Sequence, residues 1–148
     1  MKNQKGFNLI ELLITVSIIG IITGIAVPSY NQHITNKSRN DATTTLLELM
    51  RAEEDFYANE FIYTTELEEI NANNYTSAFK KSVTNSFTVS SERYYITAQE
   101  CTGIELSLCV ELKATPINAQ DDDGDKGGEF TLNSRGERTY DTSPGWPK

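Results

Sequence analysis

The stretch from Gly6 to Tyr30 reads GFNLIELLITVSIIGIITGIAVPSY, and it decides how the rest of the chain is interpreted. Its apolar run from Phe7 to Val27 contains about 20 residues, so a helix rising about 1.5 Å per residue would be roughly 30 Å long. That length matches the hydrocarbon thickness of a bilayer. The sequence therefore predicts one membrane-spanning helix over residues 7–28.

A short polar leader, MKNQKG, precedes this run. A secretory signal peptide has its small-residue cleavage site after the apolar segment, whereas here the small residue Gly6 comes before it. We therefore expect cleavage after Gly6, which removes residues 1–6. Lys2 and Lys5 lie on the leader side, so the positive-inside rule predicts a cytoplasmic amino terminus and a head in the periplasm or beyond.

Glu11 is a carboxylate inside the apolar run. Its burial in lipid would cost about 2.5 to 3.5 kcal/mol on insertion scales, so the group needs a partner. Cleavage after Gly6 would create an amino group on Phe7, and in a staggered stack of helices this amine would neutralise Glu11 of a neighbouring subunit. The alternative is that Glu11 lies close enough to the helix start to reach the lipid headgroups.

Beyond Pro28 the polarity rises, while apolar residues recur at helical spacing as far as Tyr57. This pattern predicts an amphipathic helix over residues 29–59 that packs its apolar face on a sheet. Residues 60–86 show no sustained period and are predicted to form a connecting loop. Alternation and β-branched or aromatic residues predict strands at 87–90, 94–100, 106–115, 129–133 and 137–140.

Short connections between these strands favour an antiparallel sheet, so we expect an α+β head over residues 60–148. The two cysteines of the chain, Cys101 and Cys109, fall in this head, outside the cytoplasm. An oxidising compartment and a hairpin-like spacing favour a disulfide between them, and two unpaired buried thiols are the alternative. Two cysteines and the distant His33 do not make a four-ligand metal set.

A run of aspartates around a glycine is the one cluster with ligand-binding chemistry, and it comprises Asp121, Asp123 and Asp125, followed by Glu129. Alternate carboxylates around a glycine turn can surround a hard cation, so the run is compatible with a calcium site. It lacks the full spacing of an EF-hand loop, and an exposed acidic turn between two strands is the more common explanation. No other cofactor is expected.

The formal net charge is −8, and Lys and Arg do not cluster along the sequence. Binding of a phosphate backbone requires clustered cations, so this composition argues against a nucleic-acid partner. The sequence shows no nucleophile paired with a base, no phosphate-cradling glycine loop and no catalytic metal motif. We therefore expect a protein that is not an enzyme, and a solvated role for His33.

The amino-terminal residues resemble the signature of type IV pilins, competence pilins and type II secretion pseudopilins. The similarity rests on Gly6 before Phe7, a carboxylate at Glu11, a single apolar helix and a proline at Pro28. It implies the type IV pilin fold, N-methylation of Phe7 by a prepilin peptidase, and packing of the helix into a filament core. In such packing, Gly20 and Gly24 either permit local loss of helix or let neighbouring helices approach closely.

The resemblance implies a structural subunit of a type IV pilus, which serves adhesion, twitching motility or DNA uptake. Such a subunit is held in the inner membrane by its helix until an assembly machinery extrudes it into an extracellular filament of pilin subunits. The segment FYANEFIYTT at residues 56–65 is similar to the helix exit of minor pilins and favours that class. The alternatives are a type II secretion pseudopilin and a DNA-binding competence pilin, and the acidic head counts against the latter.

Overall fold

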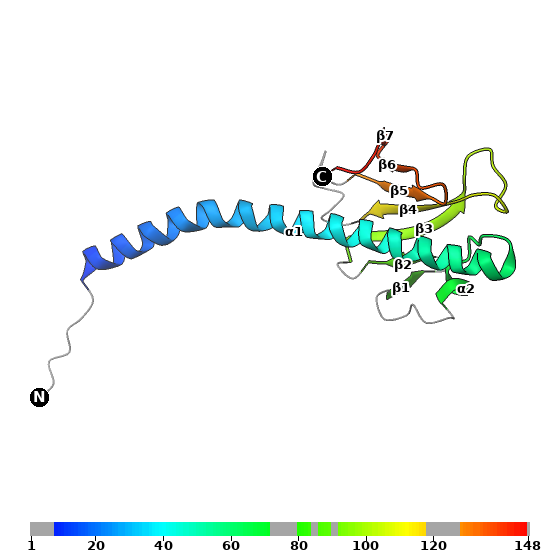
Figure 1. Cartoon of the computed structure of the whole chain (residues 1–148). Helices are drawn as coiled ribbons and strands as arrows, with labels where there is room; N and C mark the ends of the chain where they lie inside the picture. The colour runs from blue at the N-terminus through cyan, green and yellow to red at the C-terminus, as the bar shows by residue number, and fades with distance from the viewer. Residues whose placement is uncertain (1–7, 72–79, 84–85, 90–91, 118–127, 148) are drawn as a thin grey trace, which may run out of the picture. The chain divides into compact units, whose positions relative to one another are not determined.

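The structure is a computed structural model that describes residues 8–71, 80–83, 86–89, 92–117 and 128–147. Two compact units make up the chain, Met1–Ile34 and Thr35–Lys148. The helices are α1 (Leu9–Glu60) and α2 (Leu67–Asn71). The strands, labelled in Figure 1, are β1 (Lys80–Val83), β2 (Ser86–Thr88), β3 (Tyr94–Glu100), β4 (Val110–Pro116), β5 (Phe130–Asn133), β6 (Arg138–Tyr140) and β7 (Ser143–Pro144).

The first unit consists of the amino-terminal part of α1, and Asn8 caps this helix. The Asn8 side chain accepts a hydrogen bond from the Ile10 backbone N–H at 3.4 Å, and its carbonyl accepts one from Leu12 at 3.2 Å. Both bonds satisfy amide donors that a helix start otherwise leaves free. Pro28 lies inside α1, which continues through it to Glu60. The predicted long amino-terminal helix is therefore confirmed.

The second unit contains a single sheet whose seven strands lie side by side in chain order, each antiparallel to the next. The expected antiparallel arrangement is confirmed, and β3 coincides with the predicted strand at 94–100. In the longest pairing, Tyr94 lies opposite Pro116 and Glu100 lies opposite Val110. The link between β3 and β4 is closed by the predicted disulfide, with the Cα atoms of Cys101 and Cys109 5.6 Å apart.

The structure corrects the predicted strand at 106–115, because β4 begins only at Val110. Residues before it form turns, in which the Leu108 and Cys109 amides donate to the Glu105 carbonyl at 2.9 and 3.1 Å. The bond from Cys101 to Cys109 closes a loop too short for both sides to remain extended. The apolar residues there imitate a strand pattern but belong to the disulfide loop.

The structure also corrects the single loop predicted over residues 60–86, because α2 and β1 lie within it. Leu67 and Ile70 of α2 are buried, with 0% and 3% of their surface exposed. The Thr64 hydroxyl accepts a hydrogen bond from the Glu66 amide at 2.9 Å just before the helix. Two apolar residues three positions apart are enough to dock one helical turn, although they are too few to produce a recognisable period.

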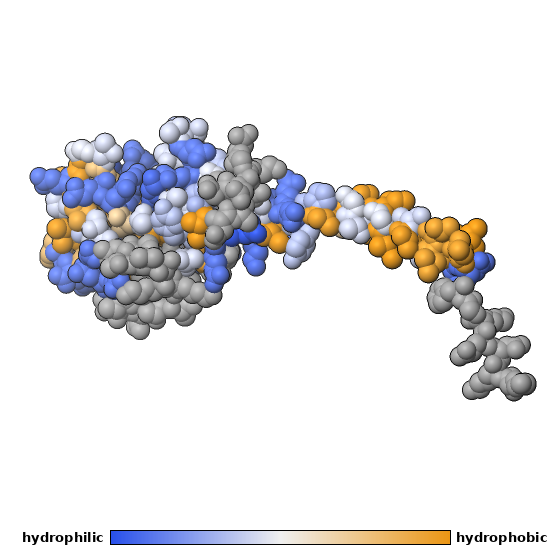
Figure 2. Space-filling model, turned by 180° about the vertical axis from the view of Figure 1, so that it is seen from behind, coloured by the Kyte–Doolittle hydropathy of each residue, from blue (hydrophilic) through white to orange (hydrophobic). Residues whose placement is uncertain are grey.

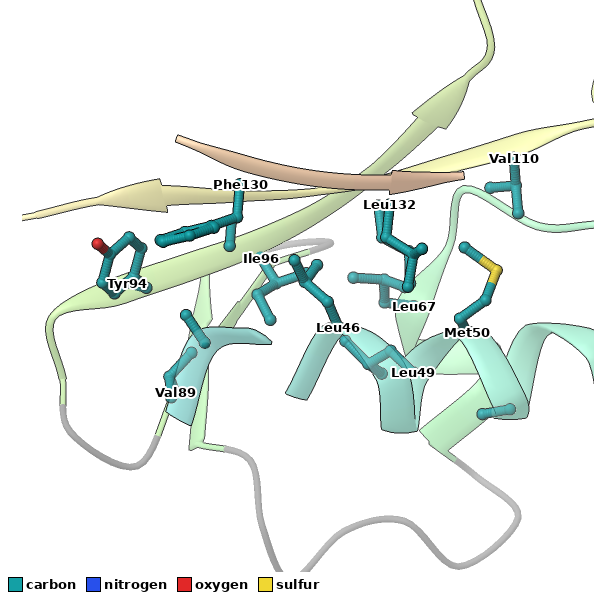
Figure 3. Packing of buried hydrophobic residues seen from close by; sticks show 14 of the residues in the cluster. Leu46, Leu49, Met50, Leu67, Val89, Tyr94, Ile96, Val110, Phe130 and Leu132 are labelled. Atoms are coloured by element: carbon teal, nitrogen blue, oxygen red, sulfur yellow. The ribbon is translucent and has the colours of Figure 1, made fainter. Parts of the chain in front are cut away.

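The core of the second unit lies between α1 and the sheet (Figure 3). Leu46, Leu49 and Met50 of α1 point towards Ile96 of β3 and Leu132 of β5. These five side chains are at most 9% exposed. Burial of such residues stabilises a fold by about 1.5 to 3 kcal/mol each relative to exposure. The stripe that predicted an amphipathic helix is thus the helical half of the core.

Candidate assembly and binding sites

The first unit exposes large apolar side chains along its length, and Figure 2 shows one face of this apolar surface. Between Leu9 and Tyr30, the exposed fraction of the large apolar side chains runs from 51% for Ile18 to 76% for Leu9. α1 is also the one helix among the described residues that is long and apolar enough to cross a membrane. An apolar surface of this extent is typical of a segment that lies in lipid or in a protein interface.

The serine and threonine side chains of this unit form hydrogen bonds within the helix. Thr15 donates to the Leu12 carbonyl, Ser17 to Leu13 and Thr23 to Ile19, each at 2.8 Å. Hydroxyl groups that bond to the preceding turn enter an apolar environment at a lower cost than free ones. Glu11 differs, because it lies exposed in the first turn of the helix. Its negative charge at a helix amino terminus is favourable, but a carboxylate in an apolar environment still needs a partner.

Both predicted processing residues, Gly6 and Phe7, lie outside the described residues. Cleavage, methylation and the contact between the Phe7 amine and Glu11 therefore stay predictions. Gly20 and Gly24 are both helical, and a Cβ atom placed on either would meet no atom within 4 Å. Both glycines are therefore open to a neighbouring helix.

Asp121, Asp123 and Asp125 of the predicted calcium site also lie outside the described residues. Glu129, the fourth candidate ligand, pairs its Oε2 with the Lys113 Nζ at 2.8 Å. Its backbone N–H donates to Asp141 Oδ1 at 3.0 Å. No metal-binding group of His, Cys, Asp and Glu occurs among the described residues. The calcium site stays a prediction, and Glu129 already has a partner.

A pocket of about 270 Å³ opens in the second unit between α1 and the carboxyl-terminal segment. One side of it is a polar face of α1, whose residues follow the i, i+3, i+4, i+7 spacing of one helix face. The opposite side is apolar and aromatic. The lining residues are Asn36, Arg39, Asn40 and Thr43 from α1, with Phe130, Trp146 and Pro147 facing them.

Trp146 is held in a fixed orientation at this pocket. Its indole Nε1 donates a hydrogen bond to the Thr131 carbonyl at 3.0 Å. Its ring meets Phe130 edge-on, with the ring centroids 6.3 Å apart. The Arg138 guanidinium lies 4.7 Å from its centroid, within the range of a cation–π interaction. An aromatic wall held by three contacts is preorganised for stacking.

Arg39 brings a positive charge to the same pocket. Its Nη2 donates to the Tyr140 hydroxyl at 3.4 Å, and its Cζ lies 5.9 Å from the centre of the Tyr140 ring. Among the described residues no carboxylate pairs with this guanidinium, and its Nε has no hydrogen-bond partner. A cation without a carboxylate partner in a chain of net charge −8 is a candidate anion-binding group.

Glu53 is a further unusual group, buried on the apolar face of α1 with no exposed surface. Its Oε2 accepts a hydrogen bond from the Thr64 backbone N–H at 3.2 Å, whereas Oε1 has no partner among the described residues. Burial raises the pKa of this carboxyl to about 7. The Thr64 hydrogen bond opposes the shift, and the nearby Glu54 charge adds to it. Glu53 therefore titrates near neutral pH and fixes the chain just after α1.

Sequence analysis did not identify Arg39, Trp146 or Glu53. Arg39 and Trp146 lie near opposite ends of the second unit in sequence, so only the folded chain brings them together. Glu53 left a signal, because it falls four positions after Leu49 and three after Met50 on the apolar stripe of α1. A carboxylate on a buried stripe indicates a hydrogen-bonded or protonated group.

Comparison with known families gives two matches. Residues 28–131 match the family model described as type IV minor pilin ComP, DNA uptake sequence receptor. Residues 1–27 match the prokaryotic N-terminal methylation motif. The first match covers the second half of α1 and most of the sheet, and the second covers the leader and the apolar helix.

Among curated relatives, a fimbrial protein of Moraxella nonliquefaciens is 48% identical over 44 residues, which are 30% of this chain and 29% of that protein. The type IV major pilin protein PilA of Myxococcus xanthus is 36% identical over 67 residues, 45% of this chain and 30% of that protein. The type IV major fimbrial protein FimA of Dichelobacter nodosus is 42% identical over 64 residues, which are 36% of this chain and 40% of that protein. The chain thus spans less than half the length of these relatives. The family match extends over most of the chain, so this protein belongs to the type IV pilin family, within the group of minor pilins.

Proposed function

We propose that this chain is a minor structural subunit of a type IV pilus. The observation that carries the proposal is the contrast within α1, whose first part exposes a continuous apolar surface while its second part is built into a folded head. Such a surface is stable only in lipid or against other apolar helices. A membrane-held subunit that later packs into a filament experiences both environments in turn.

In this proposal a prepilin peptidase cleaves after Gly6 and methylates Phe7, and an inner-membrane machinery then extrudes the subunit. The head lies in the periplasm before extrusion and on the extracellular filament afterwards. Glu11 sets the register, because its carboxylate is neutralised when it meets the Phe7 amine of the neighbouring subunit. The filament is thus held together by apolar packing and aligned by one ion pair.

The test replaces Glu11 by Ala and counts the copies of the subunit in filaments sheared from the cells. We expect the amino-terminal peptide to remain processed, since the cleavage site is intact, while incorporation into filaments falls at least ten-fold. Such a loss corresponds to about 1.4 kcal/mol, less than the cost of an unpaired buried charge. The matched control is Glu48→Ala, because Glu48 is an exposed carboxylate of the same helix within the head.

Normal incorporation of the Glu11→Ala variant would contradict the proposal. The same mass spectrometry measures the share of this chain in wild-type filaments. A trace amount supports a minor pilin, a dominant amount indicates a major one, and a processed chain found only in membranes indicates a pseudopilin.

A second candidate function is DNA binding on the filament. The family model is described as a DNA uptake sequence receptor. The net charge of −8 opposes a general affinity for DNA, but the pocket described above places the cation Arg39 near the aromatic residues Phe130 and Trp146. Binding of a labelled duplex by the full processed chain in detergent micelles at physiological salt would support this function, and the absence of any binding would remove it.

A further inference from the structure

The second unit exposes large apolar side chains in two different settings. Phe61 and Ile62, which follow the last residue of α1, are 78% and 44% exposed, and we call them the Phe61 segment. Phe61 has the largest exposed fraction among the large apolar residues that the structure describes. Leu47 is 39% exposed on α1, where it lines a groove. One of these surfaces therefore projects from the head, and the other is hollow.

The Phe61 segment is held in place although its side chains gain little from the chain itself. Phe61 has φ at 60°, a left-handed conformation that is unfavourable for phenylalanine. On one side its N–H bonds to the Tyr57 carbonyl, and on the other side Tyr63 stacks on the Tyr57 ring with the centroids 4.5 Å apart. Strained backbone that its surroundings hold in place is concentrated at functional sites. An exposed ring fixed in this way is preorganised for a contact outside the chain.

The groove measures about 430 Å³ and lies between α1 and the turn that joins β5 to β6, and we call it the Leu47 groove. Its apolar lining is Leu47, Met50 and Leu132, of which the last two lie between helix and sheet in Figure 3. The rest of the lining consists of two guanidinium groups, two carboxylates and the polar turn, from Arg51, Arg138, Glu54, Asp55, Asn133, Ser134 and Gly136.

This lining favours an apolar occupant. The two cations and the two carboxylates balance, so a charged group that enters the groove meets repulsion as well as attraction. An apolar ring instead covers Leu47 and removes its exposed surface from water. A volume of about 430 Å³ lies within the range of ligand sites, roughly 300 to 1,000 Å³, and accommodates a phenylalanine side chain. Phe61 does not line the groove of its own chain, which leaves the groove open to the ring of another copy.

A filament joins its subunits through contacts between two different surfaces, because a contact between identical surfaces closes a dimer and cannot extend. The Phe61 segment and the Leu47 groove are two such surfaces on one head. We propose that the Phe61 segment of one copy docks in the Leu47 groove of the next copy. The inference rests on the proposed function and adds a contact between heads to the packing between apolar helices.

The size of this contact determines where it forms. One ring and one neighbouring side chain cover far less than the roughly 1,200 Å² that stable interfaces bury. The contact therefore forms where the membrane or the filament core already holds two copies close together, which raises the effective concentration of one head for the other. Heads at low density stay separate.

The test joins the two surfaces covalently in lipid vesicles densely loaded with the full processed chain. Ile62→Cys marks the Phe61 segment and Arg51→Cys marks the groove, so that Phe61 and Leu47 both remain. The two native cysteines form a disulfide, which leaves only the introduced thiols free to react with a short bismaleimide. We expect the double variant to form covalent dimers and longer chains, about five-fold or more above a control pair of thiols. Each single variant should stay monomeric, because the contact joins unlike surfaces.

The control pair is Ile62→Cys with Glu48→Cys, because Glu48 is exposed on the same helix, three positions from Arg51, and does not line the groove. It measures the yield from random collision. Adding Phe61→Asn to the reactive pair should reduce the covalent products about five-fold or more, since it removes the docking ring and keeps both thiols. Thermal melting of each variant, followed by circular dichroism, checks that its head is folded.

Three results would overturn the inference. Equal yields from the Arg51 and Glu48 pairs would mean that the heads meet by collision only. Dimers from Ile62→Cys alone at the yield of the double variant would mean that like surfaces meet. An unchanged yield after Phe61→Asn would exclude the ring as the docking group. Each result leaves the role as a filament subunit intact, because that role fails only if the Glu11→Ala variant is incorporated normally.

Discussion

The two parts of α1 treat apolar residues in opposite ways. From Leu9 to Val27 the large apolar side chains are all more than half exposed, whereas Leu46 and Leu49 in the head are at most 3% exposed. The apolar surface of the first part is removed from water only when lipid or another subunit covers it. The surface of the second part is covered by the chain's own sheet. One helix thus serves both assembly and folding. Its first part is apolar on all sides, whereas in its second part the apolar residues form a stripe along one face.

The largest effect is expected from a matched pair of truncations in the two parts. Leu46→Ala should lower the free energy of unfolding of the head by about 2 to 5 kcal/mol, because it opens a cavity in the core. Leu13→Ala makes the same change on an exposed residue, so head stability should change by less than about 0.5 kcal/mol. Denaturant unfolding of both variants in micelles, followed by circular dichroism, checks the pair. A similar loss in both would mean that the two parts of α1 fold as one cooperative unit.

The sequence was sufficient for the features in which one physical signal dominates. The length and polarity of the run from Phe7 to Val27 predict the apolar part of α1, and the alternation in β3 matches its buried Tyr94 and Ile96. The prediction from sequence was wrong where a strand-like pattern and a disulfide loop overlap. The residues before Val110 have the composition of a strand, but they form turns within the loop that the disulfide closes. The pocket at Arg39 was out of reach, since Asn36, Arg39 and Asn40 look like any solvated helix face until the fold places Trp146 opposite them.

The two carboxylates that interrupt the apolar pattern of α1 give a second, smaller contrast. Glu11 is exposed in the single chain, whereas Glu53 is buried and has its pKa raised from 4.5 to about 7. The folded head therefore holds a proton on Glu53 that the unfolded chain releases between pH 4.5 and pH 7. The contribution of Glu53 to stability is greatest below pH 4.5, and it declines as the pH rises to about 7.

Glu53→Gln should abolish this decline, because the amide oxygen still accepts the Thr64 N–H but cannot ionise. We expect the variant to be more stable than wild type at pH 8 by about 1 to 3 kcal/mol, and equally stable at pH 4. Thermal unfolding across this pH range checks the difference, and Glu48→Gln provides an exposed control on the same helix. A pH-independent difference between Glu53→Gln and wild type would show that Glu53 does not titrate in the folded head.

The smallest effect on stability is expected at Phe61, an apolar residue of the head that is exposed. Phe61 follows the last residue of α1 with φ at 60° and donates its N–H to the Tyr57 carbonyl at 2.8 Å, which is the left-handed cap of a helix end. A phenylalanine is unfavourable in this conformation, and its side chain is 78% exposed, so it gains little from burial. Asn tolerates the left-handed region, and Phe61→Asn should therefore raise the stability of the head by about 0.5 to 1 kcal/mol.

Ile62→Asn is the matched control, because it also removes an exposed apolar side chain but from a residue without a positive φ. It should not raise stability, and comparison of the two melting temperatures isolates the backbone effect. If Phe61→Asn is stabilising and yet lowers the share of this chain in filaments, the exposed ring contacts another subunit. The exposed apolar surface used for assembly would then extend beyond Val27 to the far end of α1. If stability rises and incorporation is unchanged, assembly depends on the first part of the helix alone. The first part then serves assembly, and the second part serves folding of the head.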